Sequence, residues 1–373
     1  MKGGGSFSFA SASIQLDLRS ILTASTLATL SAMTTKIKEY NPQNMIFRRL
    51  GNTGLRVPIL SLGGWLSYGG SVSGTQVNDI FKAAFEAGIN FFDTAESYGN
   101  GSSEIEMGRA IKELGLRRTS LIVSTKLFGG VGRKGPNDRG LSRKHLVEGM
   151  NESLQRLQMD YVDIVFAHLP DLDVPMLEIV QGFTWLINQG KAFYWGTSNW
   201  SVVQIEEAHH IAHAHGLIAP AAEQCCYNAF NRKRVEEEYQ HLYDRYGYGL
   251  TTYSPLDGGF LTGKYNSGEI PGDSRYATSK DDPWIASLRE LLGSEKGKER
   301  IAKVKKLEII AHELQTDLAT LSLAWVMKNP HVSTLIIGAT RVSQVESNLK
   351  ALELLPKLSD EAYQRIHDIF GVE

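Results

Sequence analysis

Short apolar runs recur along the chain from residue 59 onward, and segments with helical periodicity separate most of them. After the first run, the apolar residues between Val77 and Phe85 fall on one helical face. A strand followed by a helix, repeated, predicts a parallel sheet, and eight repeats close a (β/α)8 TIM barrel. The pattern alone leaves an open, doubly wound sheet as the alternative. The eight runs are Ile59–Leu62, Ile89–Phe92, Leu121–Ser124, Val162–Phe166, Phe193–Gly196, Ala221–Glu223, Leu250–Tyr253 and Thr334–Ile337.

The chain before the first run has two parts with different patterns. Residues 47–57 form two short segments joined by a glycine-containing turn, which predicts an N-terminal β-hairpin. Residues 1–44 are rich in small and polar residues and poor in acids, and we expect a disordered N-terminal tail there. A transit peptide is the alternative, although basic residues are few in this segment. Residues 45–373 form the expected barrel domain.

Composition narrows the class of protein. The 373 residues are 42% hydrophobic and 21% charged, as in a globular protein with a sizeable core. Lys and Arg number 39 against 41 Asp and Glu, so no bulk positive charge favours nucleic-acid binding. No apolar stretch approaches the roughly 20 residues that span a bilayer, so direct membrane insertion is not expected. The two cysteines, Cys225 and Cys226, are adjacent and provide no disulfide framework, which favours a cytoplasmic location.

Four polar side chains follow three consecutive predicted strands, and in a barrel the chemistry gathers at these strand ends. They are Asp93, Tyr98, Lys126 and His168. Carbonyl reduction needs a proton donor at oxygen, and tyrosine, with a pKa of about 10, is too weak an acid unless a cation lies nearby. Lys126 is the candidate cation, Asp93 orients it, and His168 is a candidate hydrogen-bond partner of the substrate oxygen. Each residue alone is more often structural, so their combination carries the prediction.

Three motifs in this order and spacing resemble the aldo-keto reductases. The resemblance runs from about residue 47 to the C-terminus. It is closest to the beta subunits of voltage-gated potassium channels and their fungal relatives, through residues 139–145, 153–158 and 187–198. The three motifs are Asp93-Thr94-Ala95-Glu96-Ser97-Tyr98-Gly99, Ser124-Thr125-Lys126 and Gly196-Thr197-Ser198-Asn199.

The resemblance implies a (β/α)8 barrel that binds NADPH (or NADP) across the carboxyl ends of its strands. It implies reduction of aldehydes or ketones to alcohols by hydride transfer, with Tyr98 as the general acid and Asp93, Lys126 and His168 completing the catalytic tetrad. The implied cofactor-binding residues follow the first, fifth, sixth, seventh and eighth strands. They are Trp65, Ser198, Asn199, Gln224, Tyr253, Ser254, Pro255, Leu256, Lys264, Ser274, Arg275, Gly338, Thr340, Gln344 and Asn348.

The resemblance assigns groups of these residues to different parts of the cofactor. Ser198, Asn199 and Gln224 correspond to residues that hold the nicotinamide amide, and Tyr253 corresponds to the ring that stacks on the nicotinamide. The residues from Ser254 to Arg275 correspond to a loop over the pyrophosphate, and those after the eighth strand to the adenosine 2′-phosphate end. A helix N-terminus after the eighth strand would favour phosphate there. Arg341 is an additional candidate for the 2′-phosphate.

The chain departs from mammalian channel beta subunits at several positions. His168, Asn199 and Tyr253 stand where those proteins usually carry Asn, Arg and Trp, and each is the form seen in ordinary aldo-keto reductases. A histidine can donate to a carbonyl and titrate near neutral pH, which favours an active enzyme. Ser347 stands where the channel subunits have a Glu that contacts the adenine. The alternative function is a redox-sensing regulatory subunit, with a homo-tetramer and a channel's cytosolic domain as candidate partners beside a small carbonyl substrate.

Three further motifs suggest other chemistry. Residues 130–135 fit G-x-G-x-x-G, but no helix is expected to begin at these glycines, which argues against a Rossmann site. His209 and His213 have a zinc-compatible spacing, yet a solvated helix face is the more ordinary interpretation, and no metal is expected. Cys225 and Cys226 are interpreted as two small buried residues, because a redox-sensing thiol needs a lowered pKa.

Overall fold

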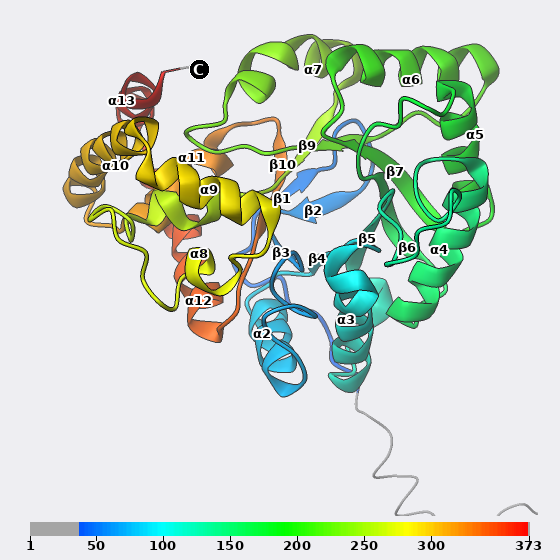
Figure 1. Ribbon diagram of the computed structural model, residues 1–373, viewed down its shortest axis with the longest axis horizontal. Helices are drawn as coiled ribbons and strands as arrows, with labels where there is room; N and C mark the ends of the chain where they lie inside the picture. The colour runs from blue at the N-terminus through cyan, green and yellow to red at the C-terminus, as the bar shows by residue number, and fades with distance from the viewer. Residues whose placement is uncertain (1–36, 372–373) are drawn as a thin grey trace, which may run out of the picture. The chain divides into compact units, whose positions relative to one another are not determined.

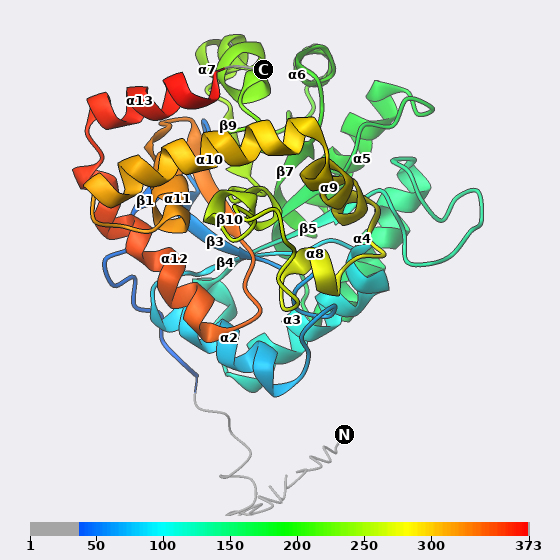
Figure 2. The same cartoon turned by 60° about the vertical axis from the view of Figure 1, so that its left-hand side comes forward.

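Eight parallel strands form a closed barrel in the compact unit that begins at Lys38. The computed structural model describes residues 37–371, and the expectations for residues 1–36 lie outside this range. Figures 1 and 2 show the strands at the centre, surrounded by helices. The barrel strands are β3 (Leu60–Gly63), β4 (Phe91–Asp93), β5 (Ile122–Leu127), β6 (Val162–Ala167), β7 (Ala192–Ser198), β8 (Ala222–Gln224), β9 (Gly249–Thr252) and β10 (Val332–Ile337).

The pairing of the first and last strands decides between the two predicted architectures. Consecutive strands from β3 to β10 pair in parallel, and β10 also pairs with β3, with Leu335 opposite Leu60. This pairing closes the sheet, so the (β/α)8 barrel is confirmed and the open, doubly wound sheet is excluded. Each of the eight predicted apolar runs overlaps one barrel strand.

Helices cover the outside of the barrel, and their starts follow local signals in the sequence. The predicted apolar face between Val77 and Phe85 is buried in the first helix. Ser201 and Gln204 form a capping box at the start of the helix after β7. The helices that follow the strands are α2 (Thr75–Glu86), α3 (Ser102–Glu113), α4 (Arg143–Leu157), α5 (Met176–Asn188), α6 (Val202–His215), α7 (Gln240–Tyr246), α11 (Leu318–Lys328) and α12 (Val342–Leu354).

An insertion separates β9 from α11 and contains three helices of its own, α8 (Arg275–Thr278), α9 (Pro283–Gly293) and α10 (Glu295–Glu313). A buried ion pair links the start of this insertion to its last helix, with Arg300 Nη1 2.8 Å from Asp257 Oδ2. A further helix, α13 (Asp360–Phe370), follows α12 and packs on α10. The insertion therefore lies at the carboxyl end of β9, and its last helix, α10, packs against α11 and α13 (Figure 2).

The predicted hairpin is confirmed as antiparallel β1 (Phe47–Arg49) and β2 (Arg56–Pro58). The hairpin residues Leu50 and Val57 are fully buried, and they pack on side chains inside the barrel. Burying such apolar surface is the main favourable contribution to folding. The hairpin therefore closes the amino-terminal end of the barrel. The remaining buried members of this cluster are Phe91, Ile122, Ile164, Phe166 and Ala222.

The residues just before the hairpin pack against the barrel helices. Lys38 N donates to Gly115 O, and Tyr40 donates from its hydroxyl to Gly88 O at 2.7 Å. The compact unit therefore begins at Lys38 rather than at residue 45, because a single aromatic anchor such as Tyr40 leaves no periodic signal in the sequence. Among the helices of residues 37–371, none is long and apolar enough to cross a bilayer.

Candidate active site

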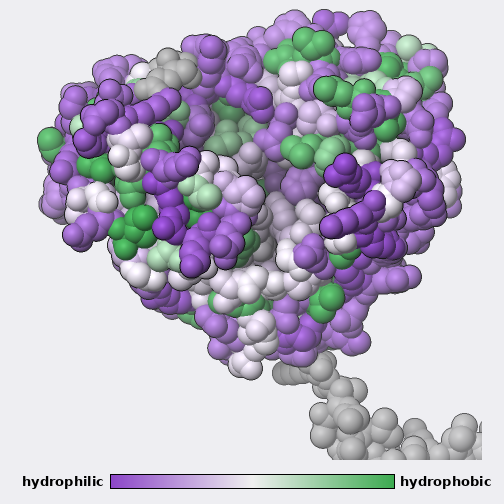
Figure 3. All heavy atoms as spheres, in the orientation of Figure 1, coloured by the Kyte–Doolittle hydropathy of each residue, from purple (hydrophilic) through white to green (hydrophobic). Residues whose placement is uncertain are grey.

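A cavity of about 1360 Å³ opens at the carboxyl ends of the barrel strands. It is lined by every residue predicted for the site except Lys126, which is fully buried. In Figure 3 this face is hollowed between the surface over α8 and α9 and the surface on the α4 side. The barrel thus brings to one cavity side chains that are spread from Trp65 to Asn348 in the sequence.

A buried ion pair lies at the centre of the site. Lys126 Nζ is 2.6 Å from Asp93 Oδ2 and donates to Thr94 O at 2.7 Å. Burial is the largest influence on Lys126 and lowers its pKa, which the neighbouring Asp93 carboxylate opposes. The other oxygen of Asp93 accepts hydrogen bonds from Ser124 and Gln224. The Asp93 carboxylate therefore fixes the lysine from strand β5 against strand β4.

Tyr98 lies over this pair at the end of the β4 loop. Lys126 Nζ is 4.7 Å from the centre of the Tyr98 ring. The His168 ring lies edge-on to the Tyr98 ring, with 5.5 Å between their centres. Burial, and next the Asp93 charge, raise the pKa of Tyr98 well above its usual value, so the phenol keeps its proton at neutral pH. The net shift of the Tyr98 pKa is therefore upward, although the Lys126 ammonium lies close to the ring.

The pKa of His168 differs from the expected value near neutral pH. Burial, together with the nearby Lys126 ammonium, lowers the pKa of His168 to about 3. The prediction that this histidine titrates near neutral pH is therefore wrong. The reason is that a charged imidazole would lose its hydration next to an existing cation. His168 N donates to Leu127 O, which holds the residue at the end of β6 beside β5. A neutral imidazole in this position can still donate one hydrogen bond.

Glu96 was missed by the sequence analysis, although it lies within the motif between Asp93 and Tyr98. It is 1% exposed, and its Oε1 accepts from Phe128 N at 2.7 Å and Gly130 N at 2.9 Å. The same oxygen is 3.0 Å from His145 Nε2 on α4. Burial favours a raised pKa, but His145 and the two backbone donors outweigh it and lower the pKa of Glu96. This carboxylate joins the loop that carries Tyr98 to the end of β5.

The residues expected at the nicotinamide end form a hydrogen-bonded group. Ser198 donates from its hydroxyl to Gln224 O at 2.9 Å, and the Tyr253 hydroxyl donates to Asn199 Oδ1 at 2.8 Å. Asn199 and Ser254 both have left-handed backbone angles, with φ of 61° and 53°. Such angles are uncommon outside glycine and mark sites where the chain is held in a specific turn. These loops place four polar side chains at one wall of the cavity.

The opposite end of the cavity collects positive charge. Lys264 and Arg275 both line it, and their mutual repulsion is one cause, after burial, of the lowered pKa of Lys264. Arg341 also lines the cavity and pairs at 3.1 Å with Asp273, an exposed residue. Ser274 lines the same space, and its side chain is buried. A buried hydroxyl-bearing residue beside converging cations fits the phosphate groups of a dinucleotide.

The last predicted contacts lie at the start of α12. The amide of Thr340 donates to Gln344 Oε1 at 2.7 Å, and Asn348 is mostly buried one helical turn further along. A side chain added at Gly338 would lie 3.3 Å from Arg275 Nη2, so the missing side chain leaves room for this guanidinium. The arrangement gives the cavity a helix N-terminus, which favours negative charge. Gln76 and Trp284, which also line the cavity, were not anticipated from the sequence.

The other suggested motifs do not form sites. The G-x-G-x-x-G segment is followed by loop until α4 begins after Ser142, so no helix starts at its glycines. His209 stacks on Tyr246 with 4.0 Å between ring centres, so the solvated-face interpretation fails for this histidine. Within residues 37–371 no group of His, Cys, Asp or Glu side chains is placed to hold a metal ion.

Both cysteines have thiols that are poor candidates for redox sensing. Burial raises the pKa of Cys226 to about 12 and that of Cys225 well above its usual value. A reactive thiol requires the opposite shift. The interpretation as a small buried residue therefore holds for Cys225, whereas Cys226 is partly exposed.

The family model described as the Aldo/keto reductase family matches residues 59–370, which is most of the chain. The chain belongs to the aldo/keto reductase family. The match spans every barrel strand and the insertion after β9. Membership places the protein among oxidoreductases and supports the predicted resemblance.

Three similar proteins carry the name of voltage-gated potassium channel subunit beta. The one from Schizosaccharomyces pombe is 47% identical over 340 residues, covering 91% of this chain and 97% of that protein. The one from Oryza sativa subsp. japonica is 46% identical, and the one from Arabidopsis thaliana is 45% identical, each over 325 residues. Each of these two alignments covers 87% of this chain and 96% of the relative.

Proposed function

We propose that this aldo/keto reductase reduces aldehydes or ketones to alcohols with NADPH, using Tyr98 as the general acid. The observation that carries the proposal is the buried Lys126–Asp93 pair directly against the Tyr98 ring, at the wall of the large cavity. A buried ion pair is costly to desolvate and is weak evidence for stability by itself. Its position beside a buried phenol favours a catalytic role.

Proton transfer follows from the state of each group. Tyr98 is protonated at neutral pH and donates to the carbonyl oxygen as negative charge develops there. Lys126 stabilises the phenolate that forms, because its ammonium is held close to the ring by Asp93. Neutral His168 donates a hydrogen bond to the same substrate oxygen and so orients the carbonyl.

The cofactor, when bound, supplies the hydride that reaches the carbonyl carbon. Ser198, Asn199 and Gln224 would hold the nicotinamide amide, and Tyr253 would form the wall under the ring. Trp65, Pro255, Leu256 and the cationic end of the cavity would hold the rest of the dinucleotide. Because Arg341 adds to the positive charge of Lys264 and Arg275, we infer a preference for NADPH over NADH.

Turnover of simple aldehydes and ketones, measured with NADPH and NADH side by side, tests this proposal. We expect activity with at least one carbonyl compound and a lower KM for NADPH than for NADH. Removing Arg341 as Arg341→Gln should narrow the difference between the two cofactors while leaving kcat nearly unchanged. Complete inactivity across the panel, in protein that binds NADPH, would contradict the catalytic proposal.

A second candidate function is regulatory association with a voltage-gated potassium channel in the cytoplasm. It is favoured by the names of relatives that are 45–47% identical over nearly their whole length. In that case the protein would assemble as a homo-tetramer and bind a channel's cytosolic domain. Sizing of the purified protein and pull-down with such a domain test it. A monomer that fails to bind would argue against this second function and would leave the enzymatic proposal intact.

A further inference from the structure

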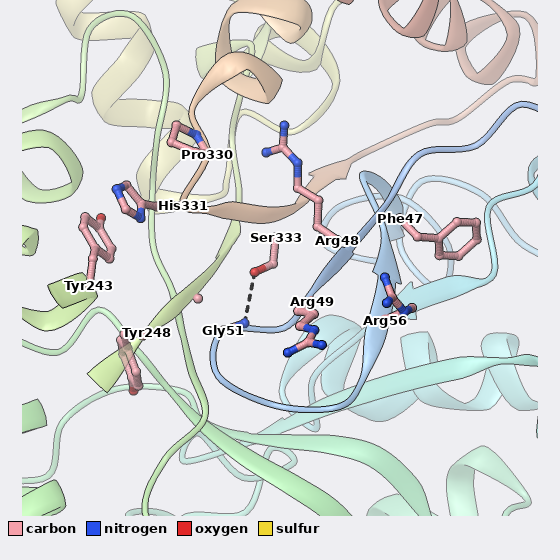
Figure 4. A pocket seen from close by; sticks show the side chains of 12 residues that line it. Phe47, Arg48, Arg49, Gly51, Arg56, Tyr243, Tyr248, Pro330, His331 and Ser333 are labelled. Carbon is pink, nitrogen blue, oxygen red and sulfur yellow. Dashed lines mark hydrogen bonds between the residues drawn. The ribbon is translucent and has the colours of Figure 1, made fainter. Parts of the chain in front are cut away.

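A second cavity, of about 480 Å³, lies at the amino-terminal end of the barrel, away from the residues described above. The hairpin forms one wall, and the starts of β9 and β10 form the other. Figure 4 shows its side chains, with Arg49 and Arg56 on the hairpin and Tyr243 and His331 across from them. The proposed function uses none of these residues.

Two arginines face each other on the hairpin without a counter-ion. Arg49 and Arg56 are direct cross-strand partners in the register of β1 and β2. In such a pair the Cβ atoms lie about 4.5–5.5 Å apart, and two like charges destabilise the strands. Both side chains are exposed and line the cavity, and neither has a hydrogen bond or ion pair among the described residues. The hairpin therefore carries two arginines at directly paired positions, and neither has an ion-pair partner among the described residues.

A third arginine that lines the cavity is bound to the main chain. Arg48 also lines it, but its guanidinium donates to three main-chain carbonyls, Asn329 O, Met327 O and Val332 O, at 2.7–2.8 Å. This arginine anchors the hairpin to the end of β10 and keeps its neighbour Arg49 in place. Its positive charge also has no carboxylate partner in the described residues.

The far wall is aromatic. Tyr243 and His331 stack with 3.8 Å between ring centres. Burial lowers the pKa of His331, an effect that the charge of Asp244 opposes. Gly51 and Gly249 approach so closely that a side chain on either would collide with the other's backbone nitrogen. These contacts fix the shape of the cavity around the arginine pair.

We propose that this cavity binds a small anion through a phosphate or carboxylate group held by Arg49 and Arg56. The guanidinium fork matches both groups and forms charge-assisted, bidentate hydrogen bonds with them. Binding relieves the repulsion between the two arginines and so stabilises the hairpin that closes the barrel. The concave shape, bounded by Tyr243 and His331, suits a small molecule better than a flat bilayer surface.

Phosphate titration of the full chain, followed by thermal unfolding and calorimetry, tests the proposal. Inorganic phosphate should raise Tm more than sodium chloride at equal ionic strength. Arg49→Gln and Arg56→Gln should each weaken phosphate binding at least tenfold. Without phosphate at low salt, each variant should be at least as stable as the wild type, because the like-charge pair is gone.

Two control variants separate this site from other sources of phosphate binding. Arg139→Gln removes an exposed arginine with no ion pair or hydrogen bond in the described residues, and it should bind phosphate as the wild type does. Arg275→Gln removes a cation from the cofactor cavity, and the hairpin site should survive it. Equal phosphate binding by Arg49→Gln and Arg139→Gln would overturn the proposal. Loss of all phosphate binding in Arg275→Gln would overturn it as well.

Discussion

The two ends of the barrel differ in the side chains that cover them. At the amino-terminal end, Leu50 and Val57 of the hairpin pack on apolar side chains inside the barrel, and all are buried. At the carboxyl-terminal end, the strands terminate in charged and polar groups around a cavity of about 1360 Å³. Lys126 and Asp93 are buried there as an ion pair at 2.6 Å.

The contrast indicates which end stabilises the fold and which end is available for chemistry. An apolar plug stabilises the barrel because it removes hydrocarbon from water. A buried ion pair contributes little net stability, because desolvation offsets its attraction, yet losing one partner is costly. The carboxyl-terminal end therefore keeps charges in place at some cost in stability, and the packed end helps to compensate for that cost.

The largest expected effect comes from removing one charge of the buried pair. Lys126→Met leaves Asp93 buried without its cation, which costs about 3–5 kcal/mol of stability. Turnover should also be lost, because no charge then stabilises the developing Tyr98 phenolate. Chemical denaturation and steady-state kinetics measure the two effects. A variant with wild-type stability and turnover would show that the buried ion pair is needed neither for folding nor for catalysis.

Tyr98→Phe tests the same end without disturbing charge. Turnover should fall by about 10²- to 10⁴-fold, the usual contribution of general acid catalysis. Affinity for NADPH, followed by fluorescence titration, should change little, because the ring remains. Unchanged turnover would exclude Tyr98 as the proton donor.

Leu50→Ala tests the packed end. Truncating this fully buried leucine should cost about 2–5 kcal/mol of unfolding free energy. Turnover per folded molecule should stay near wild type, since the hairpin lies at the other end of the barrel. Leu172→Ala is the matched control, because Leu172 is 86% exposed and its truncation should leave stability unchanged. A loss of turnover in Leu50→Ala at full folding would show that the two ends are coupled.

Glu96→Gln tests whether the buried Glu96 carboxylate helps to position Tyr98. Glutamine keeps an acceptor oxygen for Phe128 N and Gly130 N but loses the charge that faces His145. We expect a drop in kcat of roughly tenfold, smaller than that of Tyr98→Phe, since only the position of Tyr98 is affected. Glu96→Ala, which removes the acceptor altogether, should lower kcat further. Equal activity of both variants and the wild type would mean that the hydrogen bonds of Glu96 do not affect turnover.

Two pH dependences of opposite sign test buried titratable groups near the barrel wall and the cavity. Burial raises the pKa of Glu223, in the wall of the barrel, to about 8. The folded state then binds more protons than the unfolded chain between pH 4.5 and 8, so stability falls as pH rises through this window. The pKa of His168 is lowered to about 3, so the stability associated with a neutral His168 is present above pH 6.5 and is lost as pH falls toward 3.

Two conservative variants separate these contributions. Glu223→Gln should flatten the decline of unfolding free energy between pH 5 and 8, and His168→Asn should flatten the loss below pH 6. Denaturation curves at several pH values measure both. If each variant kept the wild-type pH dependence of unfolding free energy, folding would shift the pKa of neither Glu223 nor His168.

Much of the fold could be read from local pattern. The period of apolar runs predicted the barrel because each strand is buried on both faces and each helix on one. The turn at Gly51 and the capping residues Ser201 and Gln204 are local signals, since their hydrogen bonds join near neighbours in the chain. The role of Tyr40 in the start of the folded unit was not predictable, because its partners Phe85 and Gly88 are distant in sequence.

The sequence by itself determined the order of the elements and the polar residues at the strand ends, because periodicity and residue type are properties of the chain. Only the tertiary structure decided what those residues do to one another. The pairing of β5 with β4 sets the 2.6 Å contact of Lys126 with Asp93, and the packing of α4 beside these strands brings His145 against Glu96. Burial beside Lys126 holds His168 neutral, contrary to expectation. Desolvation and charge coupling depend on all neighbours in space, and a linear pattern does not contain them.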